Sequence, residues 1–284
     1  MLPPYKGGQK LNILFTLDEN YLQPMQTLLC SILVSNPGEH FDVYLISDNI
    51  RQESLSAVQR MLSRCGGNLH LISAGSEAFA QAPTVRYYSR AMYYRLLAGE
   101  LLPQSLDRIL YLDPDMLVTG PLRPLYETPL NDKLYAACIH RGLINISGPV
   151  NKLRLSTYEA EGYYNSGMLL MNLPLIRQRV RPDDIFSYVH ENRQLLVLPD
   201  QDVLNALYGE QILPLDELRY NYNARKYREY LLTTQGKTDI NWVMANTCIL
   251  HFCGKVKPWK KTCRSRFAAL YRHYMHLAEI YLSA

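Results

Sequence analysis

The sequence predicts an α/β protein in which helices cover the faces of a mostly parallel central sheet. Three observations support this fold class. Apolar, strand-like runs alternate with helical patterns near the start of the chain, polar side chains follow these runs directly, and 48% of the residues are hydrophobic against 20% charged. A chain of 284 residues with this composition is long enough to bury a sizeable core.

The first part of the chain reads as strand, helix, strand, helix, strand. The predicted elements are a strand at Asn12–Leu17, a helix with apolar residues at i, i+3, i+4 spacing from Met25 to Leu33, a strand at Phe41–Ile46, a helix at Gln52–Arg64 ended by Gly66 and Gly67, and a strand at Leu69–Ile72. This order is typical of a parallel sheet, in which ligands bind beyond the carboxyl ends of the strands. Asp18, Asn20 and Tyr21 follow the first strand and therefore lie in a ligand position.

A second ligand position follows the buried strand predicted at Ile109–Leu112. Asp113 and Asp115 are two residues apart, so in extended chain their side chains point to the same face, and Pro114 favours that conformation. Two carboxylates so close repel unless a cation lies between them, and Mg²⁺ or Mn²⁺ prefers such ligands. The alternative is a solvated turn after a strand.

Tyr87–Leu97 is predicted to be a helix that carries Arg90 and Arg95 on different faces. Either arginine could hold an acidic ligand or contact Asp113, and the alternative for each is a solvated side chain. A strand is predicted at Tyr135–Ile139.

The polar, irregular segment His140–Tyr164 follows, and a connection of this length is usually functional. Ser166 and Gly167 precede another buried strand, which indicates either close backbone approach by a ligand or an ordinary turn. The next helix is predicted at Pro182–Arg193, and Asp200 is placed to cap the helix after it.

The end of the chain is predicted to contain a strand at Thr247–Gly254 and a helix at Arg264–Leu282. His251 in that strand is either a buried core histidine or a ligand. The helix has an apolar stripe flanked by arginines, so it either packs on the core or lies on an anionic membrane surface.

Composition and motifs exclude several function classes. The net charge of +4 is too small to indicate nucleic acid, and neither a dinucleotide-binding nor a P-loop glycine motif occurs. No secretory signal and no membrane-spanning run is visible, and the six cysteines lack the pattern of a disulfide scaffold. We therefore expect free thiols and a cytoplasmic protein.

Four motifs, in this order, resemble the family-8 retaining glycosyltransferases, which include bacterial lipooligosaccharide galactosyl- and glucosyltransferases and, more distantly, glycogenin. They are Leu112-Asp113-Pro114-Asp115, Tyr164-Asn165-Ser166-Gly167, Asp200-Gln201-Asp202 and the run from His251 to Trp259. The resemblance covers Asn12 to Trp259 and implies a GT-A fold, with a catalytic domain at residues 1–258 and a basic, aromatic helical tail at 259–284. Ser166 departs from the family pattern, where alanine is common, and the C-terminal tail is short.

The resemblance also implies roles for individual residues. Asp113, Asp115 and His251 correspond to the ligands of Mn²⁺ or Mg²⁺. The other positions carried over are Asp18, Asn20 and Tyr21 for the uridine, Arg95 and Asn165 for the donor sugar, Gly254 and Lys257 for the diphosphate, and Asp200 and Gln201, with Asn165, for catalysis beside the anomeric carbon.

The expected function is transfer of glucose or galactose from its UDP-sugar to a glycan acceptor of cell-surface polysaccharide or lipopolysaccharide, with retention of configuration. The acceptor is expected on the segment His140–Tyr164. Gln201 is a poor nucleophile, which favours front-face attack over a covalent intermediate. Peripheral contact with the inner face of the membrane through the tail is also expected. The alternatives are a glycogenin-like protein that glucosylates itself and a non-catalytic protein that binds UDP-sugars.

Overall fold

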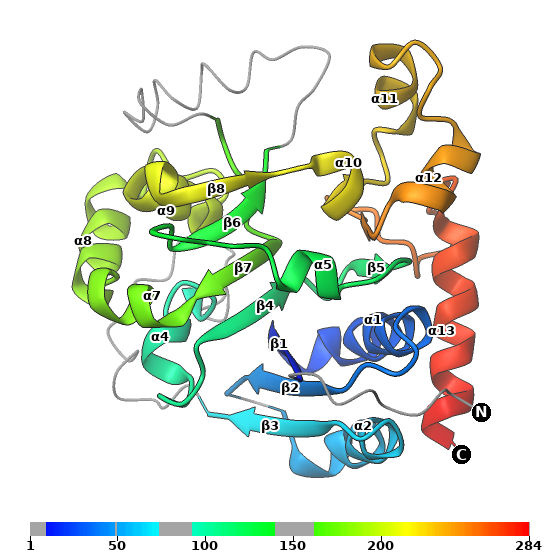
Figure 1. Ribbon diagram of the computed structural model, residues 1–284, viewed down its shortest axis with the longest axis horizontal. Coiled ribbons are helices and arrows are strands. Elements are labelled where there is room, and N and C mark those ends of the chain that lie inside the picture. Colours follow the sequence, from blue (N-terminus) through cyan, green and yellow to red (C-terminus); the bar gives the residue numbers. More distant parts are fainter. Residues whose placement is uncertain (1–9, 49, 74–92, 140–161, 284) are drawn as a thin grey trace.

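A computed structural model describes residues 10–48, 50–73, 93–139 and 162–283, whose strands form two sheets (Figure 1). The larger sheet has the strand order β3 (Asn68–Ile72), β2 (Phe41–Ile46), β1 (Leu11–Thr16), β4 (Arg108–Leu112), β7 (Met168–Asn172), β6 (Tyr135–Cys138) and β8 (Ile212–Leu215). The smaller sheet has the order β5 (Met116–Val118), β10 (Ile249–His251) and β9 (Tyr222–Asn223).

The larger sheet is mixed and mostly parallel, as predicted. Strands β3, β2, β1 and β4 run parallel to one another, whereas β7 is antiparallel to both β4 and β6, and β8 is parallel to β6. The predicted elements of the first part of the chain are confirmed as β1, α1 (Leu22–Ser35), β2, α2 (Gln52–Arg64) and β3. Helix α2 ends where predicted because Gly66, with φ of +70°, adopts the left-handed conformation that favours glycine.

Both faces of the larger sheet are buried, so its central strands are apolar on both sides. In β1, Ile13 and Phe15 belong to one core cluster and Leu14 belongs to the other. Helices α1 and α2, with α5 (Arg123–Tyr126), cover the first face, and α4 (Ala98–Leu101), α7 (Leu173–Arg179), α8 (Pro182–Asn192) and α9 (Pro199–Tyr208) cover the second (Figure 1).

The smaller sheet joins segments that are far apart in the chain. Its central strand, β10, is antiparallel to β5 and parallel to β9. Its outer layer contains α11 (Tyr227–Thr233), α12 (Ile240–Asn246) and α13 (Ala268–Ser283), and α10 (Glu217–Tyr220) leads into β9. The predicted strand at Thr247–Gly254 is therefore confirmed but shorter, because the chain leaves the sheet after His251.

The predicted C-terminal helix is confirmed as α13, which packs on α1 and α2 (Figure 1). Tyr271 and Ala278 are buried, and Arg64 of α2 donates a hydrogen bond to the carbonyl oxygen of Tyr281 at 3.4 Å. In the described part of the chain, no helix combines the length and the apolar character needed to cross a membrane.

Two local predictions need separate treatment. Of the predicted helix Tyr87–Leu97, residues 87–92 with Arg90 lie outside the described residues, whereas residues 93–97 form tight turns and α4 begins only at Ala98. The predicted cap is wrong. Asp200 does not cap α9: Leu198 is the N-cap residue and Asp200 lies in the first turn. Ser166 donates its hydroxyl to Asp200 at 2.8 Å, so a tertiary contact holds this carboxylate.

Candidate functional site

Two aspartates and one histidine meet where the larger sheet passes into the smaller one. Asp113 follows β4, Asp115 precedes β5, and the pairing of β10 with β5 sets His251 opposite Met116. One ligand atom from each of the three side chains lies within 4.8 Å of the other two. His251 Nε2 is 3.3 Å from Asp115 Oδ1 and 4.0 Å from Asp113 Oδ2.

This group is buried and tightly packed. His251 is 4% exposed and Asp115 is 6% exposed. A Cβ atom on Gly167 would lie 2.6 Å from His251 Cε1 and 2.7 Å from Asp113 Oδ2, so no larger residue fits here without displacing them. The small residue predicted to allow close approach thus makes room for the two candidate ligands themselves.

Positive charges surround the carboxylates. Lys257 Nζ donates a hydrogen bond to Asp115 Oδ2. Burial alone would raise the pKa of Asp115, but His251 and Lys257 hold that pKa well below its ordinary value. Burial would likewise lower the pKa of His251, whereas Cys253 and Asp115 raise it well above its ordinary value.

Arg95 connects the candidate metal ligands with the candidate catalytic residues. Its Nη1 lies 2.9 Å from Asp113 Oδ1 and 3.2 Å from Asp200 Oδ2, and it donates to the carbonyl oxygen of Ser166 at 3.2 Å. The guanidinium also stacks over the ring of Tyr111, 4.5 Å from its centroid. Of the two alternatives for this arginine, the buried ion pair is therefore the one observed.

A chain of side-chain amides connects the histidine to the same region. His251 Nδ1 and Asn221 Oδ1 are 2.8 Å apart, Asn221 Nδ2 donates to Asn165 Oδ1 at 2.8 Å, and Asn165 Nδ2 donates to Gln201 Oε1 at 2.9 Å. Because the Nδ2–H group of Asn221 donates to Asn165, the Oδ1 atom of Asn221 faces His251 and accepts a hydrogen bond from its Nδ1–H. Nε2 is therefore the nitrogen that faces the aspartates, and it would be available to a metal once it gives up its own proton.

Asn221 is the main residue that the sequence analysis missed. It is 0% exposed and belongs to the alternation Tyr220-Asn221-Tyr222-Asn223 just before and within β9. A polar residue buried between aromatic residues requires a hydrogen-bonding partner, and this requirement is the signal that could have identified it.

The remaining predicted residues lie around this centre. Asp18, Asn20 and Tyr21 form the short 3-10 helix η1 (Glu19–Tyr21) and its cap, where Asp18 Oδ1 accepts from the backbone N–H of Asn20 at 2.9 Å. Tyr21 packs edge-on against Trp259, with 6.2 Å between ring centroids. This contact brings η1 beside the segment that holds Lys257 and Gly254.

Gly254 has a φ of +89°, which favours glycine, and a Cβ atom there would clash with the Arg225 guanidinium. The acceptor segment predicted at His140–Tyr164 lies outside the described residues except for its last three positions.

Residues 12–263 match the family model described as glycosyl transferase family 8. The chain belongs to glycosyltransferase family 8. This match confirms the predicted family and the prediction that the chain is a glycosyltransferase.

Similar proteins agree with this assignment. General stress protein A of Bacillus subtilis is 24% identical, over 93% of this chain and 93% of its own length. Lipopolysaccharide 1,2-glucosyltransferase of Escherichia coli is 28% identical, over 88% of this chain and 73% of its own length. A crystal structure of galactosyltransferase LgtC with donor and acceptor sugar analogs has a TM-score of 0.78 and 27% identity, and the match covers 94% of this chain and 96% of that one. The predicted GT-A fold is thereby confirmed.

Proposed function

We propose that this glycosyltransferase transfers a hexose, glucose or galactose, from a UDP-sugar to a glycan acceptor with retention of configuration, using Mn²⁺ or Mg²⁺. The observation that carries the proposal is the convergence of Asp113, Asp115 and His251, with Lys257 beside them. Similar proteins include a lipopolysaccharide glucosyltransferase and a lipopolysaccharide galactosyltransferase, which supports a cell-surface glycan as acceptor.

The three candidate ligands fit a divalent cation of this kind. Carboxylate oxygens suit both Mg²⁺ and Mn²⁺, and an added imidazole favours Mn²⁺. The hydrogen bond from His251 to Asn221 presents the ring in the tautomer that a metal ligand needs. When bound, the cation would offset negative charge on the departing diphosphate.

The protein's own groups would hold the donor and stabilise charge. Lys257 would contact the diphosphate as a point charge, and Gly254 would let the backbone approach it. Asp18, Asn20 and Tyr21 would bind the uridine, with the Tyr21 ring against the base. Its ring, 36% exposed, already packs against Trp259 of the opposing segment.

The hydrogen bonds around the reacting carbon favour front-face attack. Gln201 Oε1 accepts from Asn165 Nδ2 at 2.9 Å and from the backbone N–H of Ser166 at 3.3 Å, so both of its lone pairs are engaged. Asp200 Oδ2 accepts from the Ser166 hydroxyl and pairs with Arg95. Because the Gln201 oxygen is engaged and Asp200 is held in an ion pair with Arg95, we expect the acceptor hydroxyl to attack from the side of the leaving phosphate, which would take its proton.

We further propose that the enzyme works in the cytoplasm, with peripheral contact to the inner face of the membrane. None of the six cysteines, all of them in the described part of the chain, forms a disulfide, which suits a reducing compartment. The outer side of α13 exposes Arg272 and His273 together with Ile280 and Tyr281, a combination that suits an anionic membrane surface.

The experiment is UDP release from UDP-glucose and UDP-galactose, with Mn²⁺, with Mg²⁺ and with EDTA. We expect metal-dependent release that Asp115→Ala and His251→Ala abolish, whereas the exposed control Asp132→Ala keeps the wild-type rate. Wild-type activity in either site variant would refute the metal assignment. Binding of UDP-sugar without any release would instead favour a non-catalytic sensor, and a mass increase of the protein itself would favour self-glucosylation.

A further inference from the structure

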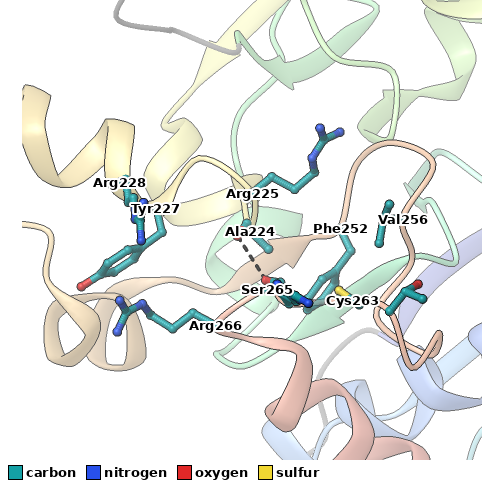
Figure 2. Close-up of a pocket in the computed structure, with 11 residues that line it drawn as sticks. Ala224, Arg225, Tyr227, Arg228, Phe252, Val256, Cys263, Ser265 and Arg266 are labelled. Atoms are coloured by element: carbon teal, nitrogen blue, oxygen red, sulfur yellow. Dashed lines mark hydrogen bonds between the residues drawn. The ribbon is translucent and has the colours of Figure 1, made fainter.

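A cavity lies beside the loop that carries Gly254, and its lining is strongly basic. It has a volume of about 570 Å³, within the range of small-molecule sites. Four of its eleven lining residues are arginines and none is acidic: Arg225, Arg228, Arg264 and Arg266. Figure 2 shows Arg225 just before α11 and Arg228 in the first turn of α11, with Arg266 approaching from the C-terminal segment.

Within the described residues, no carboxylate forms an ion pair with any of these four arginines. The acid nearest in sequence, Glu229, lies 4.0 Å from Lys226. Four guanidinium groups around one cavity repel one another, and this repulsion is relieved by an anion.

Two of the four arginines, Arg225 and Arg266, are held in place by contacts with the cavity wall. Arg266 stacks over the Tyr227 ring at 4.6 Å, and Ser265 donates its hydroxyl to the carbonyl oxygen of Ala224 at 3.3 Å (Figure 2). Arg225 Nη1 donates to the carbonyl oxygen of Cys253 at 3.3 Å. The rings of Tyr227 and Phe252 supply apolar wall between the charges. An apolar wall with a few charged groups suits a sugar that carries an anionic substituent.

The cavity is also a direct neighbour of the candidate donor site. Phe252 lines it and follows His251 in the chain, and the backbone N–H of Ala224 donates to the carbonyl oxygen of His251 at 2.9 Å. Arg225 packs against Gly254, which is proposed to approach the diphosphate. A ligand in this cavity would therefore lie across one loop from the sugar donor.

We propose that this arginine cavity binds an anionic group, phosphate or carboxylate, on the acceptor glycan. The proposal rests on the transferase function proposed above and narrows its acceptor to a charged sugar. Guanidinium groups bind both oxyanions in a bidentate manner, so the chemistry is common to a sugar phosphate and a uronic acid.

The test measures binding of glucose 6-phosphate, glucuronate and glucose by calorimetry, in the presence of saturating UDP and Mn²⁺. UDP blocks the donor site, so binding that survives it does not arise from Lys257. We expect at least one of the two anionic sugars to bind tenfold or more tightly than glucose, and the stronger of them identifies the substituent. Equal affinities for all three sugars would overturn the proposal.

Arg228→Gln and Arg264→Gln are the informative variants, because both side chains are exposed and neither makes a hydrogen bond or ion pair with a described residue. Each should weaken binding of the anionic sugar fivefold or more, while the matched change Arg193→Gln at the end of α8 leaves it unchanged. An equal loss in all three variants would indicate a non-specific charge effect and overturn the site.

Two further measurements separate the remaining possibilities. Binding to phosphatidylglycerol vesicles, without any preference among the soluble sugars, would assign the arginines to a membrane surface and overturn the glycan proposal. UDP release is measured on the same preparations. If the protein releases UDP but does not prefer the anionic sugars, only the cavity proposal is refuted. If it prefers the anionic sugars but releases no UDP, the cavity proposal is supported and the proposed hexose transfer from a UDP-sugar is refuted.

Discussion

Replacement of Asn221 by alanine should weaken metal binding, although Asn221 is not one of the three candidate metal ligands. The variant removes the acceptor for His251 Nδ1 and the donor to Asn165 Oδ1, both at 2.8 Å and both buried. Outer hydrogen-bonding partners of metal ligands typically contribute 10- to 100-fold in affinity, or about 1.4 to 2.8 kcal/mol. Loss of that acceptor for the buried His251 Nδ1–H would cost stability as well, about 1 to 3 kcal/mol, whereas Asn165 Oδ1 still accepts from the backbone N–H of Gly167 at 3.1 Å.

Asn221→Asp serves as the matched variant, because it separates the two hydrogen bonds. A carboxylate still accepts from His251 Nδ1–H, so Mn²⁺ affinity should stay within about threefold of wild type. It cannot donate to Asn165, so the amide chain to Gln201 is broken and the turnover rate should fall about tenfold or more.

Free Mn²⁺ is measured by electron paramagnetic resonance during titration, and turnover is measured by UDP release. Circular dichroism confirms that both variants are folded. A Mn²⁺ affinity of Asn221→Ala within twofold of wild type would show that His251 needs no partner to orient it, and the reasoning above would be wrong. Equal metal affinities in the alanine and aspartate variants would also contradict it.

Three other predictions follow from the site and the core. Lys257→Met leaves Asp115 without its neighbouring cation, so UDP release should fall about 100-fold or more, whereas Lys257→Arg should retain part of it; equal rates in all three proteins would contradict the role of the charge. Gly167→Ala should lower the free energy of unfolding by about 1 to 3 kcal/mol and weaken Mn²⁺ binding, because its Cβ would press on His251; an unchanged denaturant midpoint would contradict this steric argument. The free energy of unfolding should also fall above about pH 9. Buried thiols and phenols have pKa values near 9 to 10 in the unfolded chain and higher pKa values in the folded protein, so the folded protein keeps protons that the unfolded chain loses. The stability that this difference contributes is complete below the unfolded pKa values and is lost as the pH rises to the folded ones. Urea midpoints measured from neutral to alkaline pH test this, and a flat profile would refute it. The groups whose pKa burial raises to about 12 are Cys30, Tyr93, Tyr208 and Cys248.

The elements that the sequence predicts well are those with local signals. Strands β1 and β2 are mostly apolar runs, and α2 has apolar residues on one face and a left-handed glycine after its end. The carboxylate pair was also found locally, because two residues of extended chain place Asp113 and Asp115 together. These features depend on neighbours within a few positions.

Features that depend on distant partners were not predictable from the residues alone. The pairing of β10 with β5 brings His251 to the aspartates, and no pattern around either strand encodes it; the family resemblance supplied that pairing. Asp200 has the sequence context of a helix cap, yet Arg95 and Ser166 hold its carboxylate instead. Asn221 went unnoticed for the same reason, since each of its partners belongs to another segment.

The position of β10 in the chain has a consequence for how the enzyme is made. A polypeptide leaving the ribosome contains Asp113 and Asp115 for on the order of ten seconds before His251 has been added. During that time β5 lacks the strand that pairs with it, and the two acids lack their third member. If the proposed function is right, a nascent or prematurely terminated chain lacks a complete metal site and would not cleave the sugar donor.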